Sequence, residues 1–389
     1  MLDQMFSAEN FRRIYDAENR KGADLATRYF PSLEPLTRTV RDKVKEIREL
    51  RKVKSTLTDE DFEARLLALK VELTFLKAAK SSAIDALMVD INKKVLKSSF
   101  KIELSKKSGP KGKDVFCIDA EPETFFVIKQ LQRNIQGIYG VKQASRYDLV
   151  CQLRDMLGSK FPFELIRTDI SQFYESIDRQ KLIEKLDSDQ FLSVASKKYI
   201  KQALSSYEVI SGSATGIPRG VGISAYLAEL YLRPVDKAIR NLPGLVLYCR
   251  YVDDIVAMFA RSPVGKDVGS IKDKIISILG ESGLAHNDDK TYEIKLAADA
   301  SAKFEYLGYR FLVGAGKLEI SPSAAKVVKY RARTNAAFSD YWREMPVSPR
   351  SAFRKLAARI KFLTGNTRLS NSKSCAVTGV YYNNSIVND

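Results

Sequence analysis

The chain has 389 residues, which is long enough for two or three packed subdomains with a substantial core. Its 64 Lys and Arg residues outnumber 47 Asp and Glu residues, and the resulting net charge of +17 favours a polyanionic partner such as a nucleic acid. One histidine, His286, and four cysteines without Cys-x-x-Cys spacing exclude His-cluster metal sites and argue against a zinc site or His-based nucleophilic catalysis.

The first 100 residues predict helices. Apolar residues recur at helical spacing on a strongly basic segment, at Leu36, Val40, Val44, Ile47 and Leu50. Thr58 followed by Asp61 resembles a capping box that opens a second helix, whose apolar residues also share one face. A core stripe with solvated charges is the simplest interpretation, and docking on RNA is a second use of the same helices.

Residues 106–118 predict two strands joined by a turn that contains Gly and Pro and carries lysines at its tip. Further along, residues 165–177 predict a short strand that ends at Asp169 and leads into a helical turn. Asp169 could cap that helix. Alternatively, it supplies a carboxylate to a site shared with a later part of the chain.

Residues 215–232 predict a glycine-rich loop that enters a helix. Gly216, Gly220 and Gly222 would let the backbone approach a ligand closely, and a helix start favours an anion or a strand backbone.

Two adjacent carboxylates, Asp253 and Asp254, lie between apolar β-prone stretches in residues 247–259. This pattern predicts a hairpin with the acids at its tip. Like charges this close raise each other's pKa unless a cation lies between them, and sites rich in carboxylate oxygens suit Mg²⁺. A plain acidic turn is the alternative. With Asp169 beside the hairpin, the three acids would complete a two-metal site.

Three further elements are expected after the hairpin. Residues 283–292 contain Lys290, and residues 304–312 predict one aromatic strand with a hairpin partner at 317–320. From residue 322 onward the pattern is helical, and the best helix starts at Pro349, ends at Gly365 and carries basic residues that suit a duplex backbone.

In this order and spacing, these segments resemble motifs A to E of a reverse transcriptase palm. The resemblance covers residues 146–320 well and extends more weakly to both ends. It is closest to the defence-associated (abortive-infection and unknown-group) bacterial reverse transcriptases, which residues 6–22, 362–371 and 377–382 also resemble. Residues 377–379 resemble a retron motif as well.

The resemblance implies a catalytic set. Asp169 and Asp253 would be the principal Mg²⁺ ligands, with Asp254 as the adjoining acid and the backbone carbonyl of Ile170 as an additional ligand. Lys290 would protonate or neutralise the leaving pyrophosphate.

It also implies nucleotide contacts. Tyr174 would lie under the incoming sugar and exclude a 2′-hydroxyl, and Gly220 would lie near the template base. Arg219 stands where retroviral enzymes have glutamine, and Lys113, or nearly as plausibly Lys111, would reach the triphosphate. The residues expected to contact nucleic acid are Tyr251, Val252, Tyr306, Arg350, Arg354 and Lys355.

The implied fold class is α+β, a right-hand polymerase of fingers, palm and thumb with an antiparallel palm sheet and helical N-terminal and thumb regions. The expected limits are a helical N-terminal region at 1–100, fingers at 101–145, a palm at 146–320 with a fingers insertion near 179–214, and a thumb at 321–389.

The expected function is RNA-directed DNA synthesis with Mg²⁺. The partners would be an RNA template, a DNA product and dNTP, with a dedicated noncoding RNA copied in anti-phage defence and a companion reverse transcriptase, an effector protein or a second copy of the chain as further partners. With no signal peptide and no apolar run that could span a bilayer, we expect a cytoplasmic protein and no membrane partner. A retron enzyme, untemplated or protein-primed synthesis, and a catalytically silent RNA-binding scaffold remain alternatives.

Overall fold

The computed structural model describes residues 3–109, 112–159, 161–260, 270–296, 301–314, 317–365, 367–368, 377–378, 380 and 384–387. The chain divides into two compact units. The first unit contains residues 1–140, 183–213 and 218–224, and the second contains residues 141–182, 214–217 and 225–389. Each is described by itself, and the predicted subdomain limits stay predictions.

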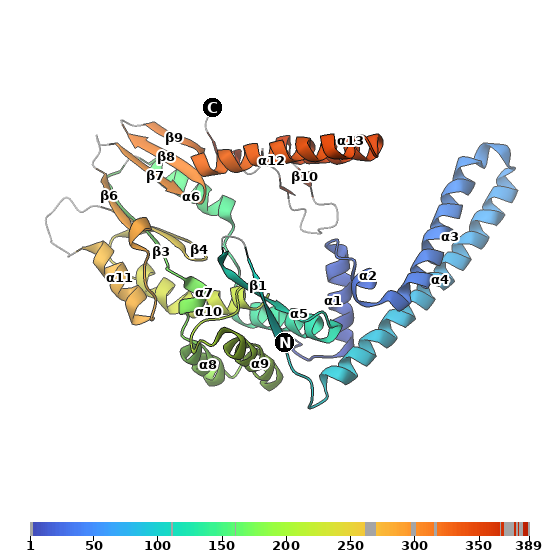
Figure 1. Ribbon diagram of the computed structural model, residues 1–389, viewed down its shortest axis with the longest axis horizontal. Helices are drawn as coiled ribbons and strands as arrows, with labels where there is room; N and C mark the ends of the chain where they lie inside the picture. The colour runs from blue at the N-terminus through green and yellow to red at the C-terminus, as the bar shows by residue number, and fades with distance from the viewer. Residues whose placement is uncertain are drawn as a thin grey trace. The chain divides into compact units, whose positions relative to one another are not determined.

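The first unit is mainly helical. Its elements are α1 (Ala8–Arg20), α2 (Leu25–Tyr29), η1 (Pro31–Leu33), α3 (Glu34–Lys52), η2 (Lys54–Thr56), α4 (Asp59–Val95), β1 (Leu104–Ser108), β2 (Asp114–Ile118), α5 (Pro122–Tyr139) and α9 (Val194–Ser211), and α8 (Arg179–Ser188) lies in both units. The long helices α3 and α4 lie side by side (Figure 1). The α4 helix begins as predicted, because the Thr58 hydroxyl accepts a hydrogen bond from the Asp61 amide at 3.2 Å.

The predicted strands around the lysine-rich turn are present as an antiparallel pair. Strand β1 pairs with β2 from Leu104 opposite Ile118 to Ser108 opposite Asp114. Residues 110 and 111, at the tip of this turn, lie outside the described residues, and with them the alternative Lys111.

The second unit is built around a four-stranded antiparallel sheet of order β4-β5-β3-β6 (Figure 1). Its strands are β3 (Phe163–Asp169), β4 (Leu245–Tyr251), β5 (Asp254–Ala260) and β6 (Tyr292–Leu296). The helices and turns along this part of the chain are α6 (Arg146–Leu157), α7 (Phe173–Ser176), α10 (Ser224–Arg240), α11 (Ile271–Glu281) and η4 (Asp288–Lys290). Strands β3 and β5 are the central pair, so each of them has a neighbouring strand on both sides.

A three-stranded antiparallel sheet of order β7-β8-β9 follows, made of Ala302–Tyr306, Tyr309–Gly314 and Lys317–Pro322. One hydrophobic core joins α6, the four-stranded sheet and this second sheet, with Leu165, Met258 and Phe311 fully buried in it. The core therefore fixes the two sheets and α6 as one body around the ends of β3 and β5.

The prediction of a single strand over residues 304–312 is wrong. Leu307 and Gly308 both have positive φ, at 48° and 81°, and they form the turn between Tyr306 and Tyr309, which are paired. Two consecutive residues with positive φ make a hairpin turn whose twist matches that of the flanking strands. The expected partner strand at 317–320 is confirmed, because β9 pairs with β8.

The C-terminal helices form a pair, α12 (Ala324–Glu344) and α13 (Pro349–Thr364) (Figure 1). Helix α13 starts at Pro349 and is capped at Gly365, as predicted. The short strands β10 (Thr367–Arg368) and β11 (Val377–Thr378) pair with each other.

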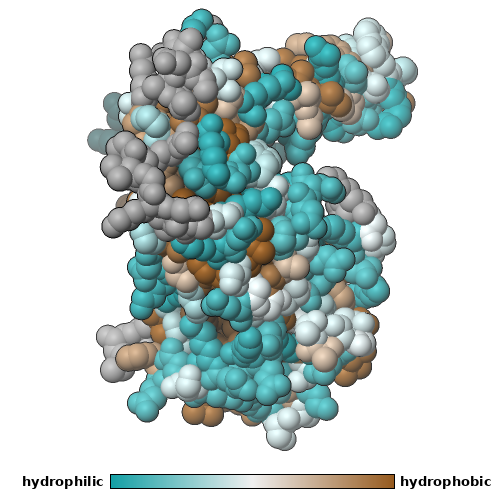
Figure 2. Space-filling view, turned by 90° about the vertical axis from the view of Figure 1, so that its left-hand side faces the viewer, coloured by the Kyte–Doolittle hydropathy of each residue, from teal (hydrophilic) through white to brown (hydrophobic). Residues whose placement is uncertain are grey.

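The α+β fold-class prediction is confirmed, because the described residues combine helices with antiparallel sheets. Hydrophilic residues predominate on the face shown in Figure 2, with apolar residues between them. Within the described residues, no helix combines the length and the apolar composition that crossing a bilayer requires.

Candidate active site

The end of β3 brings two acids of the site together. Asp169 is the last residue of β3, and its cross-strand partner is Asp254, the first residue of β5. The amide of Ile170 donates to the carbonyl of Asp253 at 3.0 Å, which ties the chain after Asp169 to the hairpin turn. The sequence alternative for Asp169 does not apply, because the residue at the N-cap of α7 is Gln172.

The hairpin turn that carries the acids is strained. Val252 has φ 60°, a left-handed conformation that costs a β-branched residue about 1–3 kcal/mol. Arg250 holds the turn, because its Nη1 donates to the carbonyl of Val252 at 3.1 Å. Arg250 also forms ion pairs of 2.7 Å with Glu229 and Asp236 on α10, and its side chain is 8% exposed. The strained turn is therefore anchored to a helix by buried charges.

The segment at 285–290 closes the other side of Asp169. The amide of Asn287 donates to the carbonyl of Asp169 at 2.8 Å. Lys290 Nζ lies 2.7 Å from Asp169 Oδ2, and the Lys290 side chain is 50% exposed. A half-exposed lysine on a nearly buried carboxylate is a partner that a stronger cation could displace.

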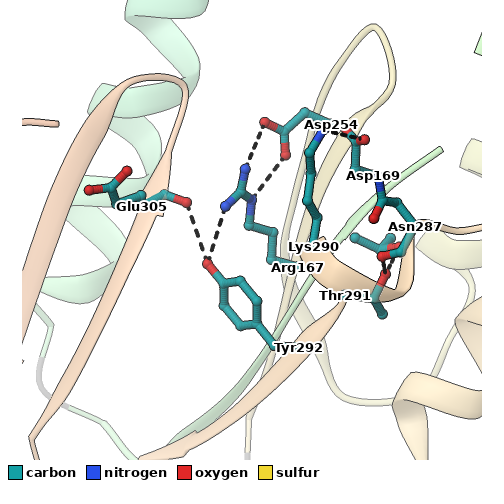
Figure 3. Close-up of polar contacts among 9 residues, drawn as sticks. Arg167, Asp169, Asp254, Asn287, Lys290, Thr291, Tyr292 and Glu305 are labelled. Atoms are coloured by element: carbon teal, nitrogen blue, oxygen red, sulfur yellow. Dashed lines mark hydrogen bonds and ion pairs between the residues drawn. The ribbon is translucent and has the colours of Figure 1, made fainter. Parts of the chain in front are cut away.

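Asp254 has a different partner (Figure 3). Arg167 Nε and Nη2 donate to the two carboxylate oxygens of Asp254 at 3.2 and 3.3 Å, and Arg167 Nη1 donates to the hydroxyl of Tyr292 at 3.4 Å. Burial raises the pKa of Asp254, Arg167 opposes that shift, and the nearby Asp169 and Asp253 add to it. The pKa of Arg167 is raised: burial works against its charge, and the bonds to Asp254 outweigh burial.

The oxygen donors of Asp169, Asp253 and Asp254 are of the type that binds a divalent metal ion. Three carboxylates face one pocket, and hard oxygen donors are the set that Mg²⁺ or Mn²⁺ prefers. Among the residues that the structure describes, no group of three or more acidic, Cys or His side chains is arranged to hold a metal as it stands. Lys290 pairs with Asp169 and Arg167 pairs with Asp254, so each of these two carboxylates has a positively charged partner.

The pocket has a volume of about 600 Å³ and an acidic and a basic wall. Asp169, Asp253 and Asp254 line it together with Arg167 and four further basic residues, Arg146, Lys326, Lys329 and Arg333. None of these four forms an ion pair with a carboxylate of the described residues. Burial and then Arg146 lower the pKa of Lys326 to about 8, and Lys326 Nζ lies 3.6 Å from the ring centre of Tyr309. This wall can accept an anion.

Tyr174 lies on α7, five residues after Asp169 in the chain, and it is half-buried. Its carbonyl accepts a hydrogen bond from the amide of Ile217 at 2.8 Å, and its ring lies 5.3 Å from that of Phe173. Ile170 is buried beside the acids. The structure thus places Tyr174 and Ile170 in the same unit as the three carboxylates, and their roles stay predictions.

The other predicted nucleotide contacts belong to the first unit. The amide of Phe116 on β2 donates to the carbonyl of Arg219 at 2.7 Å. Gly220 has φ 100°, and a Cβ there would lie 2.6 Å from Val115 Cγ1 and 2.7 Å from the carbonyl oxygen of Phe116. Gly220 is therefore required by close contact with β2, independently of any template. Lys113 is exposed just before β2.

The predicted nucleic-acid contacts have mixed surroundings. Tyr251 lines the pocket, with Arg146 4.9 Å from its ring centre. Tyr306 also lines the pocket, but its side chain is fully buried in the core. Arg350 and Arg354 are exposed on α13, and Lys355 pairs with Glu344 of α12 at 2.6 Å.

Sequence reasoning did not single out Arg167, Arg250, Arg146 or Lys326. The sequence did contain a signal for Arg167. A strand places alternate residues on one face, and Arg167 precedes Asp169 by two residues. The partners of Arg250, in contrast, lie on a helix whose packing the sequence pattern does not give.

Residues 132–311 match the family model described as reverse transcriptase (RNA-dependent DNA polymerase). No curated protein matches the chain. Among solved structures, apo telomerase from Candida tropicalis is similar at 17% identity over 68% of this chain and 58% of that one, with a TM-score of 0.44. A Candida albicans telomerase, in complex with a fragment of telomeric RNA, is 14% identical over 70% and 56%, with a TM-score of 0.39. The chain spans a little over half the length of these telomerases, and the likeness is one of fold.

Proposed function

We propose that this chain, whose residues 132–311 match the reverse transcriptase family model, is an RNA-directed DNA polymerase that extends a primer 3′-hydroxyl with deoxynucleotides. The observation that carries the proposal is the pocket that Asp169, Asp253 and Asp254 line together with a basic wall, beside the ion pair of Lys290 with Asp169. Clustered acids beside unneutralised bases suit a reaction between two polyanionic substrates.

Asp169 and Asp253 are the residues that we propose to hold Mg²⁺, with the carbonyl of Ile170 as an additional ligand. Two such ions, when bound, would activate the 3′-hydroxyl and neutralise the leaving pyrophosphate. Lys290 would be released from Asp169 and would hold a proton for the pyrophosphate.

The four basic residues of the pocket other than Arg167 would hold phosphates of the primer–template next to the acids. Because α12 carries Lys326, Lys329 and Arg333 while α6 carries Arg146, phosphate contacts from both elements would orient the primer end. Tyr174 would exclude a 2′-hydroxyl, which makes the substrate a deoxynucleotide.

The template that we propose is a dedicated noncoding RNA, copied in the cytoplasm as part of anti-phage defence. This part of the proposal is supported by the resemblance of the terminal segments to defence-associated enzymes. Residues 366, 369–371, 379, 381 and 382 of these terminal segments lie outside the described residues.

Primer extension with the purified chain tests the proposal. We expect wild-type protein to extend a DNA primer on an RNA template in Mg²⁺, and the folded Asp169→Asn and Asp253→Asn variants to lose about a thousandfold in rate or more. Asp155→Asn, on the surface of α6, is the matched control, because Asp155 is 66% exposed and is not among the residues that line the pocket.

Two further measurements distinguish templated synthesis from untemplated and protein-primed synthesis. Extension without a template would indicate untemplated synthesis, and product covalently linked to the protein would indicate protein priming. A folded wild-type protein that binds RNA but incorporates no nucleotide under any of these conditions would contradict the proposal in favour of a scaffold.

A further inference from the structure

Two basic side chains, Lys290 and Arg167, form ion pairs with the acids, and the two ion pairs differ in number of bonds and in exposure. Lys290 contacts Asp169 through one bond and is half exposed. Arg167 contacts Asp254 through two bonds, and the side chains of Arg167 and Asp254 are 17% and 16% exposed. A bidentate, mostly buried pair is costly to break, because either partner alone would leave an unpaired charge out of water.

Arg167 is also held from its other side (Figure 3). Its Nη1 donates to the hydroxyl of Tyr292 on β6, and that hydroxyl donates to the backbone carbonyl of Glu305 on β7, each at 3.4 Å. A chain of contacts therefore runs from Asp254 on β5 through β3 and β6 to the second sheet. The guanidinium of Arg167 is held by Asp254 on one side and by Tyr292 on the other, so it can keep the carboxylate of Asp254 in one orientation.

We infer that Arg167 is a positioning residue that keeps Asp254 as one half of an ion pair, leaving Asp169 and Asp253 as the carboxylates that take the divalent cation. This inference rests on the proposed function for its catalytic consequence, while its prediction for cation binding stands alone. Asp254 then contributes through its hydrogen bonds with Arg167. Its negative charge is neutralised by Arg167 and does not attract the divalent cation.

The consequence for charge is direct. Removing Arg167 frees the carboxylate of Asp254 and adds one negative charge to the pocket. A cation should then bind more tightly, although the geometry needed for the reaction is lost. A purely structural arginine would give the opposite result, because loosening the fold around the acids weakens cation binding.

The test measures Mn²⁺ binding to the nucleic-acid-free protein by electron paramagnetic resonance, together with kcat and the KM for dNTP. For Arg167→Met we expect about tenfold tighter Mn²⁺ binding, a kcat lower by about ten- to a hundredfold, and an unchanged KM for dNTP. Arg12→Met is the matched control, since Arg12 is also partly buried and ion-paired, to Asp85 at 2.6 Å, in the first unit. It should leave Mn²⁺ binding as in the wild type.

Three further variants separate charge from geometry. Arg167→Lys keeps the charge, so Mn²⁺ binding should match the wild type while kcat recovers in part. Tyr292→Phe removes the hydroxyl that orients Arg167, so kcat should fall without a change in Mn²⁺ binding. In the double variant Arg167→Met/Asp254→Asn, the added charge is gone, and Mn²⁺ binding should return to the wild-type value.

Two results would overturn the assignment. One is Mn²⁺ binding by Arg167→Met that equals or is weaker than that of the wild type. The other is a double variant that binds Mn²⁺ as weakly as Asp253→Asn, because Asp254 would then be a direct ligand. If Arg167→Met does not fold, the lysine and double variants still decide. A wild type that polymerises nothing but shows the expected Mn²⁺ pattern would remove the proposed function and leave the assignment of Arg167 standing.

Discussion

Asp169 and Asp254 face each other as cross-strand partners on β3 and β5, yet their carboxylates are held by two different cations. The pairing of β3 with β5 brings the two acids together. Lys290 and Arg167 then offset the repulsion that this pairing creates. The predictions below follow from this balance and from the surroundings of the pocket.

Lys290 should act as a proton donor in addition to its charge. Lys290→Met should lower kcat by about a hundredfold or more. Lys290→Arg keeps the charge, but a guanidinium does not release its proton, so this variant should recover only part of the loss. Single-nucleotide incorporation measured under pre-steady-state conditions checks this, with Lys317→Met on the exposed edge of β9 as the control. Full activity of Lys290→Arg would leave charge as the only role of Lys290.

Tyr174 should set the choice of sugar. Tyr174→Ala should accept ribonucleotides better and use deoxynucleotides less well, and one steric contact of this kind is worth about 1–3 kcal/mol. The measurement is the ratio of kcat/KM for matched dNTP and rNTP in wild type and variant. A folded variant with an unchanged ratio would show that Tyr174 only packs against Phe173.

Gly220→Ala should destabilise the first unit. The added Cβ meets Val115 and the backbone of Phe116, and φ 100° is strained for any residue with a side chain. We expect a loss of about 2–4 kcal/mol in the free energy of unfolding. Gly212→Ala is the control: its φ is also positive, 67°, but its Cβ would meet nothing within 4 Å, so it should lose about 1 kcal/mol. If chemical denaturation showed equal losses of unfolding free energy for Gly220→Ala and Gly212→Ala, the close contact of Gly220 with β2 would be contradicted.

Lys326 should make nucleic-acid binding depend on pH. With a pKa of about 8, below the ordinary 10.5 of lysine, Lys326 is charged below pH 8 and neutral above it. The unfolded chain binds this proton more tightly, so the free energy of unfolding should rise with pH between about 8 and 10.5. Affinity for a phosphate changes in the opposite direction, and it should fall as the pH passes 8.

The comparison of Lys326→Arg with wild type checks this pH dependence. Tyr309, whose ring Lys326 contacts, does not titrate in this range, because burial raises its pKa to about 12. Primer–template affinity at pH 7 and 9 should differ by about three- to tenfold more in the wild type than in Lys326→Arg. The same pH dependence in both proteins would assign it to another group.

Local signals in the sequence predicted much of the fold. The Asp253–Asp254 hairpin, the Pro349 start and the Thr58 cap each depend on a few adjacent residues, and the structure confirms all three. The strand at 304–312 failed because its turn uses Leu307 in a left-handed conformation, which leucine rarely adopts. Only Gly308 hinted at that turn.

The sequence pattern predicted that Asp169, Asp253 and Asp254 lie together, and the structure places all three along one pocket. Their counter-charges could not be predicted in the same way. Whether Arg167 pairs with Asp254, or Arg250 with Glu229 and Asp236, depends on which side chains the folded sheet and α10 bring within 4 Å of each other. Strand alternation limits the candidates for Arg167 but does not choose among them.

The left-handed backbone conformation of Val252 implies a conflict between thermal stability and catalytic turnover. Glycine at this position would relieve about 1–2 kcal/mol of strain, partly offset by the greater freedom of glycine in the unfolded chain. Val252→Gly should therefore unfold no earlier than the wild type on heating. Its turnover should still fall, because a relaxed turn no longer holds Asp253 in one place. At this residue, selection for heat resistance and selection for synthesis would favour different amino acids.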